Sequence, residues 1–234
     1  MQDMNVADPS PDSAFSRRTM VDRQIKTFDV TDAALLARML EVPRERFLPA
    51  DLAPLAYSDA CLQVSRGEPG ARPRTLLAPL VLARLIQGGR VLASDKALVV
   101  AAGTGYSTAL LSGLAHEVVA VESDPALFEQ TRMNLNAFGL TYVRTILAPL
   151  AAGAPNDAPF DVILVDGGVE ANLEPLFAQL KDGGRLLAVR RLPDGMGKAV
   201  RYDKADGAMG YRVLFDAAAP VLDAFHPAQE FTFA

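Results

Sequence analysis

The chain has 234 residues, half of them hydrophobic, and a formal net charge of −5 at pH 7. A chain of this length can bury one sizeable core, which favours one large domain. The acidic balance and the lack of a basic cluster argue against nucleic acid as a partner. Residues 1–15 lack the basic and apolar regions of a secretory signal, so we expect them to form a disordered lead-in.

Cysteine and histidine usage narrows the chemistry. The single cysteine, Cys61, excludes an internal disulfide and fits a reducing compartment, so we predict a cytoplasmic protein. His116 and His226 lie far apart in the sequence, so we expect no metal site. No stretch reaches the roughly 18 apolar residues that span a bilayer, so we expect no membrane partner.

The first third of the chain predicts helices. Residues 16–42 carry two helical patterns separated by Phe28 and Asp29, and either Thr31 or Asp32 can cap the second. Residues 43–74 are rich in proline, glycine and charge, which is typical of an irregular surface segment.

An apolar helix follows, beginning near Pro79 and closed by the glycine pair 88–89. We expect residues 16–90 to form a helical extension with a loop, packed as one unit with the remainder, 91–234.

From residue 96 the pattern changes to apolar strands alternating with helices, which indicates a parallel sheet covered on both faces. Residues 197–216 resemble two strands around a glycine-containing turn. The sequence therefore predicts an α/β fold: a doubly wound, mostly parallel sheet with an antiparallel C-terminal hairpin at its edge. The expected strands are 97–101, 118–122, 142–147, 160–166 and 184–190, and the expected helices are 107–115, 124–139 and 172–181.

The turn after the first of these strands has the composition of a cofactor loop. Gly103 and Gly105 permit a tight turn and close approach of a ligand to the backbone. About 20 residues further, Glu122 ends the next strand, where an acid can accept hydrogen bonds from both ribose hydroxyls. Each feature alone is compatible with plain turn chemistry or a solvated acid, whereas the pair at this spacing favours a ribose site.

The same turn argues against a dinucleotide. A dinucleotide loop usually carries a further glycine before the helix, but Thr108 stands there. A cofactor with a ribose and no pyrophosphate fits better, which by elimination favours S-adenosylmethionine.

Several motifs, in order and spacing, resemble the protein-L-isoaspartate (D-aspartate) O-methyltransferase family over nearly all of residues 16–233. They are "MVDRQI" (20–25), "VTDAALLARMLEVPRERFLP" (30–49), "AYSD" (56–59), "TLLAPLVLARL" (75–85), "AAGTGYSTALLSGLA" (101–115), "VVAVESD" (118–124), "APFDVILVDGG" (158–168) and "LKDGGRLLAV" (180–189). The resemblance implies a seven-stranded methyltransferase sheet, S-adenosylmethionine as methyl donor, and a protein or peptide carboxylate as acceptor. It further implies a methyl ester product that collapses to succinimide and permits repair of isoaspartyl linkages.

The resemblance also implies roles for individual residues. It assigns tentative catalytic roles to Thr75 and Asp59, with Leu77 at the family's serine position. It assigns cofactor contacts to Ala101, Gly103, Thr104, Gly105, Tyr106, Glu122, Leu147 and Asp166, the last two at strand ends.

Four positions mark the chain as a divergent member, because polar or glycine residues of the family are replaced there: Leu77, Val99, Ala101 and Pro149. Leucine cannot hydrogen-bond a carboxylate, and proline offers neither a carboxylate nor an N–H. Three interpretations stay open: a methyltransferase with an altered acceptor, an isoaspartyl repair enzyme with rearranged contacts, and a member that has lost catalysis and serves as a binding or interaction protein.

Overall fold

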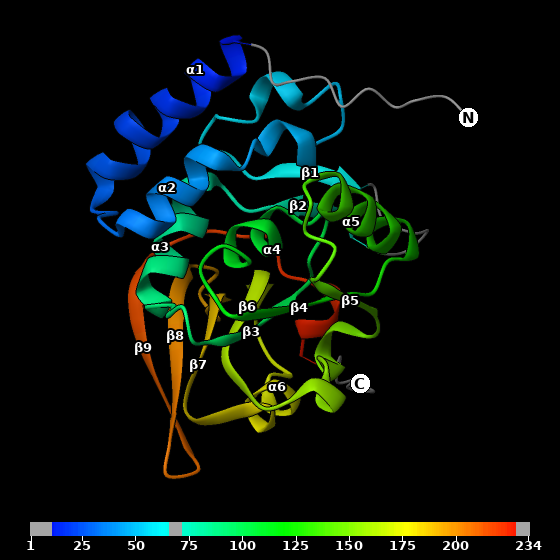
Figure 1. The fold of residues 1–234 in the computed structure, drawn as a ribbon. Helices are drawn as coiled ribbons and strands as arrows, with labels where there is room; N and C mark the ends of the chain where they lie inside the picture. The colour runs from blue at the N-terminus through cyan, green and yellow to red at the C-terminus, as the bar shows by residue number, and fades with distance from the viewer. Residues whose placement is uncertain (1–10, 66–71, 228–234) are drawn as a thin grey trace, which may run out of the picture.

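A computed structural model describes residues 11–65 and 72–227 of the chain (Figure 1). Its main sheet has seven strands in the order β5-β4-β3-β6-β7-β8-β9. The strands from β5 to β7 are parallel, and β8 and β9 pair antiparallel at the edge. Their bounds are β3 Lys96–Val100, β4 Glu117–Glu122, β5 Arg144–Leu147, β6 Phe160–Val169, β7 Leu180–Arg191, β8 Gly197–Ala205 and β9 Ala208–Asp216. The predicted sheet and its C-terminal hairpin are confirmed.

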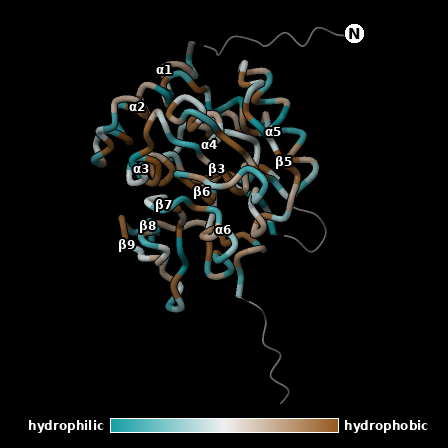
Figure 2. The backbone as a smooth tube through the Cα atoms, turned by 60° about the horizontal axis from the view of Figure 1, so that its bottom comes forward, coloured by the Kyte–Doolittle hydropathy of each residue, from teal (hydrophilic) through white to brown (hydrophobic). Residues whose placement is uncertain are grey.

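Helices follow the strands as the alternating pattern predicts. They are α4 Tyr106–Leu111, α5 Pro125–Ala137 and α6 Glu174–Ala178. Consecutive residues of β3 lie in two separate cores: Ala97 and Val99 in one, Leu98 and Val100 in the other. Figure 2 shows the hydrophobic colour gathered where β3 and β6 cross the middle of the molecule. A central strand buried on both faces explains why it is apolar throughout.

The N-terminal helices cover one face of this sheet, above it in Figure 1. They are α1 Pro11–Met20, α2 Ala33–Glu41 and α3 Pro79–Gly89, with irregular helical turns at Val21–Ile25 and Lys26–Phe28. Asp32, and not Thr31, caps α2 by accepting a hydrogen bond from the Leu35 N–H at 3.0 Å.

Part of the predicted lead-in is helical. Residues 1–10 lie outside the described residues, but residues 11–15 belong to α1. A proline at the first position, followed by Asp12 in the first turn, suits a helix N-terminus.

The segment 43–74 is predicted to be irregular and at the surface, but its described residues include regular elements and buried side chains. It contains short 3₁₀ turns at Arg44–Phe47 and Ala53–Leu55 and the strand β1 Leu62–Ser65, which pairs antiparallel with β2 Arg74–Leu76 at the end of the segment. Strand β2 packs against β6 of the main sheet. Short strands next to prolines and glycines carry too little periodicity to be recognised locally.

Candidate active site

The carboxyl ends of β3, β4 and β6 meet where the strand order changes direction. Strand β3 pairs with β4 on one side and with β6 on the other, in parallel register. In doubly wound sheets this is the place where ligands bind. The loops that leave these three strands therefore define the candidate site.

The turn after β3 keeps the backbone shape of a cofactor loop. Gly103 and Gly105 have left-handed φ angles of 61° and 99°, and Ala101 has φ of 66° although it carries a Cβ. Such a conformation costs an alanine on the order of 1 kcal/mol. Strained residues of this kind cluster at binding sites, so the strain at Ala101 marks this turn as a candidate ligand-binding element.

Two polar groups of the turn are held by the protein itself. The Thr104 hydroxyl donates to the carbonyl oxygen of Phe47 at 2.6 Å, and the Thr104 carbonyl accepts from Asn134 at 2.8 Å. These bonds clamp the turn between the N-terminal extension and α5.

Glu122 ends β4 and is 1% exposed. Its Oε2 accepts from the Gly103 N–H at 2.8 Å, and its Oε1 accepts from the N–H groups of Ser123 at 2.7 Å and Asp124 at 3.0 Å. Arg74 of β2 makes a bidentate ion pair with both oxygens, at 2.8 and 2.9 Å. Glu122 is thus adjacent to the glycine turn, as its spacing predicts, and it already has a cationic partner.

A buried polar cluster lies beneath the turn. Arg44 is fully buried, donates to the Leu77 carbonyl oxygen at 2.8 Å, and stacks over the Tyr106 ring at 4.8 Å. The Tyr106 ring also contacts Phe47 edge-on. Tyr106 therefore packs in the core. The Leu77 side chain is 1% exposed, so the family's serine position is occupied by core packing.

Asp166 of β6 is the titratable acid of the site. It is 3% exposed, and its Oδ1 has no hydrogen-bond partner among the described residues. Burial raises the pKa of Asp166 to about 6, and the Ser107 side chain, followed by the charges of Arg44 and Arg74, offsets only part of that rise. An orphaned buried carboxylate oxygen is a receptor for a donor group of a ligand.

Thr75 and Asp59, the two tentative catalytic residues, both take part in secondary structure. Thr75 pairs with Gln63 in the β1–β2 ribbon. The exposed Asp59 accepts a hydrogen bond from the Leu80 N–H at 3.2 Å, in the first turn of α3. Asp59 therefore stabilises the N-terminus of that helix.

The loop after β5 offers little to a ligand. Leu147 is 48% exposed and Pro149 follows it at the surface. The Ala148 N–H donates a hydrogen bond to the Glu122 carbonyl oxygen at 3.0 Å. Any contact from this loop therefore falls to carbonyl groups or to the Leu147 side chain.

Sequence reasoning missed Arg74 and Arg44. Each acts through a partner more than thirty residues away, and neither stands in a recognisable local motif. The only available signal was that a buried acid such as Glu122 needs a basic partner. The sequence does not show which arginine that is, because such a pair has no preferred spacing along the chain.

The residues present fit S-adenosylmethionine in part. The left-handed turn, the terminal acid Glu122 and the orphaned oxygen of Asp166 suit a ribose and an amino-acid moiety. Arg74 forms an ion pair with Glu122, the acid that would bind the ribose, so the fit requires the Arg74 side chain to move. Within the described ranges, no helix is long and apolar enough to cross a bilayer, and no cluster of three metal-ligating side chains occurs.

This sheet order, with a glycine turn after β3 and an acid ending β4, defines the class of α/β methyltransferases. The family can be stated too, because a model described as "Protein-L-isoaspartate(D-aspartate) O-methyltransferase (PCMT)" matches residues 16–217. The chain belongs to that family.

Curated relatives are similar to this chain over most of their length. A protein-L-isoaspartate O-methyltransferase of Methylorubrum extorquens (strain PA1) is 39% identical over 189 residues, covering 81% of this chain and 80% of the relative. One from Opitutus terrae is 37% identical over 188 residues, covering 80% and 76%.

Solved structures support the fold. A protein-L-isoaspartate O-methyltransferase, 26% identical, superposes with a TM-score of 0.76 over 88% of this chain and 65% of that longer one. A Plasmodium falciparum protein described as a putative member, in complex with S-adenosyl-L-homocysteine, gives a TM-score of 0.72 at 19% identity over 89% and 98%. At that identity the second likeness concerns the fold alone.

Proposed function

We propose that the chain is an S-adenosylmethionine-dependent O-methyltransferase that methylates a carboxylate of a protein or peptide, with isoaspartyl residues as the acceptor. Family membership supports the reaction, since the curated relatives carry that name. The observation that carries the proposal is Glu122, buried at the end of β4 against the left-handed turn after β3.

The cofactor contacts divide between backbone and acids. Ala101, Gly103, Thr104 and Gly105 would present main-chain groups, Glu122 would accept the ribose hydroxyls, and Asp166 would receive a donor. Leu147 would cover the adenine side with its exposed side chain, and Tyr106 would support the turn from the core. Bound S-adenosylmethionine would supply an electrophilic methyl group on a sulfonium sulfur.

The chain's own task is then positioning. An acceptor carboxylate is already ionised at pH 7, so no side chain has to remove a proton from it. What remains is to hold that oxygen in line with the methyl group and to exclude water. Thr75 offers a hydroxyl donor on the strand that leads into the site, and Asp59 holds the start of α3 behind it.

Repair of isoaspartyl linkages in the cytoplasm extends this proposal. Support comes from the family and from Cys61, a half-buried free thiol, which fits a reducing compartment.

The test is methyl transfer with labelled S-adenosylmethionine to two peptides that differ only in an isoaspartyl or aspartyl residue. We expect a base-labile methyl ester on the isoaspartyl peptide alone. Glu122→Gln, which keeps the size of the side chain, should lose most activity through weaker cofactor binding. No ester on either peptide at high enzyme concentration would reject the proposal.

A further inference from the structure

The ion pair between Arg74 and Glu122 occupies the predicted ribose site. Two nearly equal N–O distances, 2.8 and 2.9 Å, show a bidentate contact between guanidinium and carboxylate. Together with three main-chain N–H groups, Glu122 accepts five hydrogen bonds. A carboxylate has about four lone-pair sites, so none is left for a ribose hydroxyl.

Of the two partners, Arg74 is the one able to leave. Its side chain is 12% exposed, against 1% for Glu122, and β2 is a three-residue strand at the edge of the site. The main-chain donors of Gly103, Ser123 and Asp124 stay with Glu122 when the guanidinium departs. A ribose would then replace two charge-assisted hydrogen bonds with its two hydroxyls.

The negative charge of the acceptor gives the displaced Arg74 guanidinium a new partner. The acceptor is an anion, and it would approach the edge of the sheet where the acids Glu122 and Asp166 already lie. Arg44 and Arg74 are the described cations whose charges act on Asp166. Arg44 is fully buried and held by the Leu77 carbonyl, whereas Arg74 lies on β2, which packs against β6 next to Thr75.

We propose that Arg74 exchanges partners during the reaction cycle: it pairs with Glu122 in the free protein, yields Glu122 to the cofactor's ribose, and then binds the acceptor carboxylate. This rests on the proposed function and adds a positioning residue to it. The exchange makes binding ordered, with cofactor before acceptor. It also lowers cofactor affinity, because only the fraction of molecules with the ion pair open can bind.

The experiment compares the full chain with Arg74→Gln, Arg74→Lys and the control Arg72→Gln. Arg72 lies two residues away and pairs with Asp223 at the surface, where its side chain is 58% exposed. S-adenosylhomocysteine binding is measured by calorimetry, and steady-state methyl transfer gives the acceptor KM and kcat. Circular dichroism verifies folding, and Arg74→Lys, which keeps the charge, carries the test if Arg74→Gln does not fold.

Two opposite effects are expected from Arg74→Gln. S-adenosylhomocysteine should bind about tenfold tighter, because its competitor is gone, and the acceptor KM should rise about tenfold or more with a smaller change in kcat. Arg74→Lys should fall between Arg74→Gln and the original chain in both quantities, and Arg72→Gln should match the original chain.

Three results would overturn the exchange. Unchanged or weaker S-adenosylhomocysteine binding by both Arg74 variants, with methyl transfer by the original chain, would reject Arg74 as a competitor and leave the proposed function intact. Tighter binding with an unchanged acceptor KM would reject the second half of the exchange. No binding by any form, together with no methyl transfer, would reject the exchange and the proposed function alike.

Discussion

The backbone strain at Ala101 has a measurable effect on the stability of the fold. Its φ of 66° is strained for alanine. We predict that Ala101→Gly stabilises the fold by about 1 kcal/mol, which raises Tm by about 2–4 °C for a chain of this size. Thermal unfolding followed by circular dichroism measures the shift.

Gly103→Ala is the matched control. Its φ is 61°, and an added Cβ would come no closer than 3.6 Å to any neighbour, so the space is adequate and backbone strain alone acts. It should lower stability by a similar amount. A lower Tm for Ala101→Gly would contradict the account of this turn.

Asp166 should make stability fall as pH rises through the acidic range. Burial raises its pKa from 3.8 to about 6, so between these values the folded state binds more protons than the unfolded state. The free energy of unfolding should decrease by about 2 kcal/mol from pH 4 to pH 6 relative to Asp166→Asn, which cannot titrate. Urea unfolding at a series of pH values gives the difference, and parallel profiles for the two proteins would show that Asp166 has an ordinary pKa.

At the residue scale, the sequence predicted positions better than partners. The order of strand, glycine turn and acid placed Gly103 and Glu122 together, because carboxyl ends of parallel strands meet at one edge. The contact of Arg74 with Glu122 spans 48 residues and depends on how the β1–β2 ribbon folds over the sheet, so no local pattern contains it.

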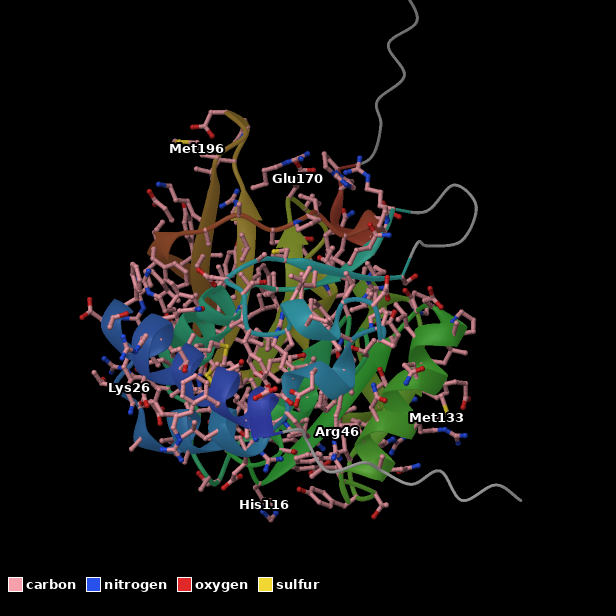
Figure 3. All side chains as sticks on the ribbon, turned by 90° about the horizontal axis from the view of Figure 1, so that it is seen from above. Lys26, Arg46, His116, Met133, Glu170 and Met196 are labelled. Carbon is pink, nitrogen blue, oxygen red and sulfur yellow. The ribbon has the colours of Figure 1, made fainter. Side chains whose placement is uncertain are left out.

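At the element scale, α5 shows the limit of periodicity. Met133 is a hydrophobic residue of this helix, but it is 52% exposed and lies at the outer edge of the molecule (Figure 3). The buried face consists of Leu127, Thr131 and Leu135, at intervals of four. The hydrophobic residues of α5 do not all lie on one face, so their pattern does not show which face is buried. The helix packs on the sheet along only one narrow stripe.

A buried ion pair joins β7 to the loop before β3. Arg185 contacts Asp95 at 2.5 Å and donates to the carbonyl oxygens of Gly89 and Arg90, both at 2.7 Å, and both charged side chains are less than a tenth exposed. Arg185→Met should cost about 3–5 kcal/mol, because it leaves the Asp95 carboxylate buried without its cation. Urea unfolding measures the loss.

The control for this pair lies on the neighbouring strand β8. Lys198 pairs with Asp216, whose side chain is 82% exposed, so Lys198→Met should cost less than about 1 kcal/mol. Equal losses for Arg185→Met and Lys198→Met would show that burial does not set the strength of the Arg185 pair.

At the scale of the whole molecule, the N-terminal extension and the sheet share one hydrophobic core. A contiguous cluster contains Met20, Leu35 and Phe47 of the extension together with β3, α4 and β6 side chains. Arg38 of α2 donates to the Ala109 carbonyl of α4 at 3.0 and 2.8 Å.

We therefore predict that residues 16–90 and 91–234 unfold in one transition, with equal calorimetric and van't Hoff enthalpies. Two resolved transitions in scanning calorimetry would show that the extension is an independent unit. The parallel sheet was predictable from its apolar strands, whereas this shared core depends on tertiary packing of amphipathic helices whose partners the sequence does not name.

The central proposal is that the carboxyl ends of β3, β4 and β6 bind the adenosine of a methyl donor. A crystal structure of the chain with saturating S-adenosylhomocysteine tests it most directly. We predict ribose hydroxyls within hydrogen-bonding distance of the Glu122 carboxylate, with the Arg74 guanidinium withdrawn from it. An Arg74–Glu122 ion pair still closed at saturation, with no ligand bound at this edge of the sheet, would contradict the proposal.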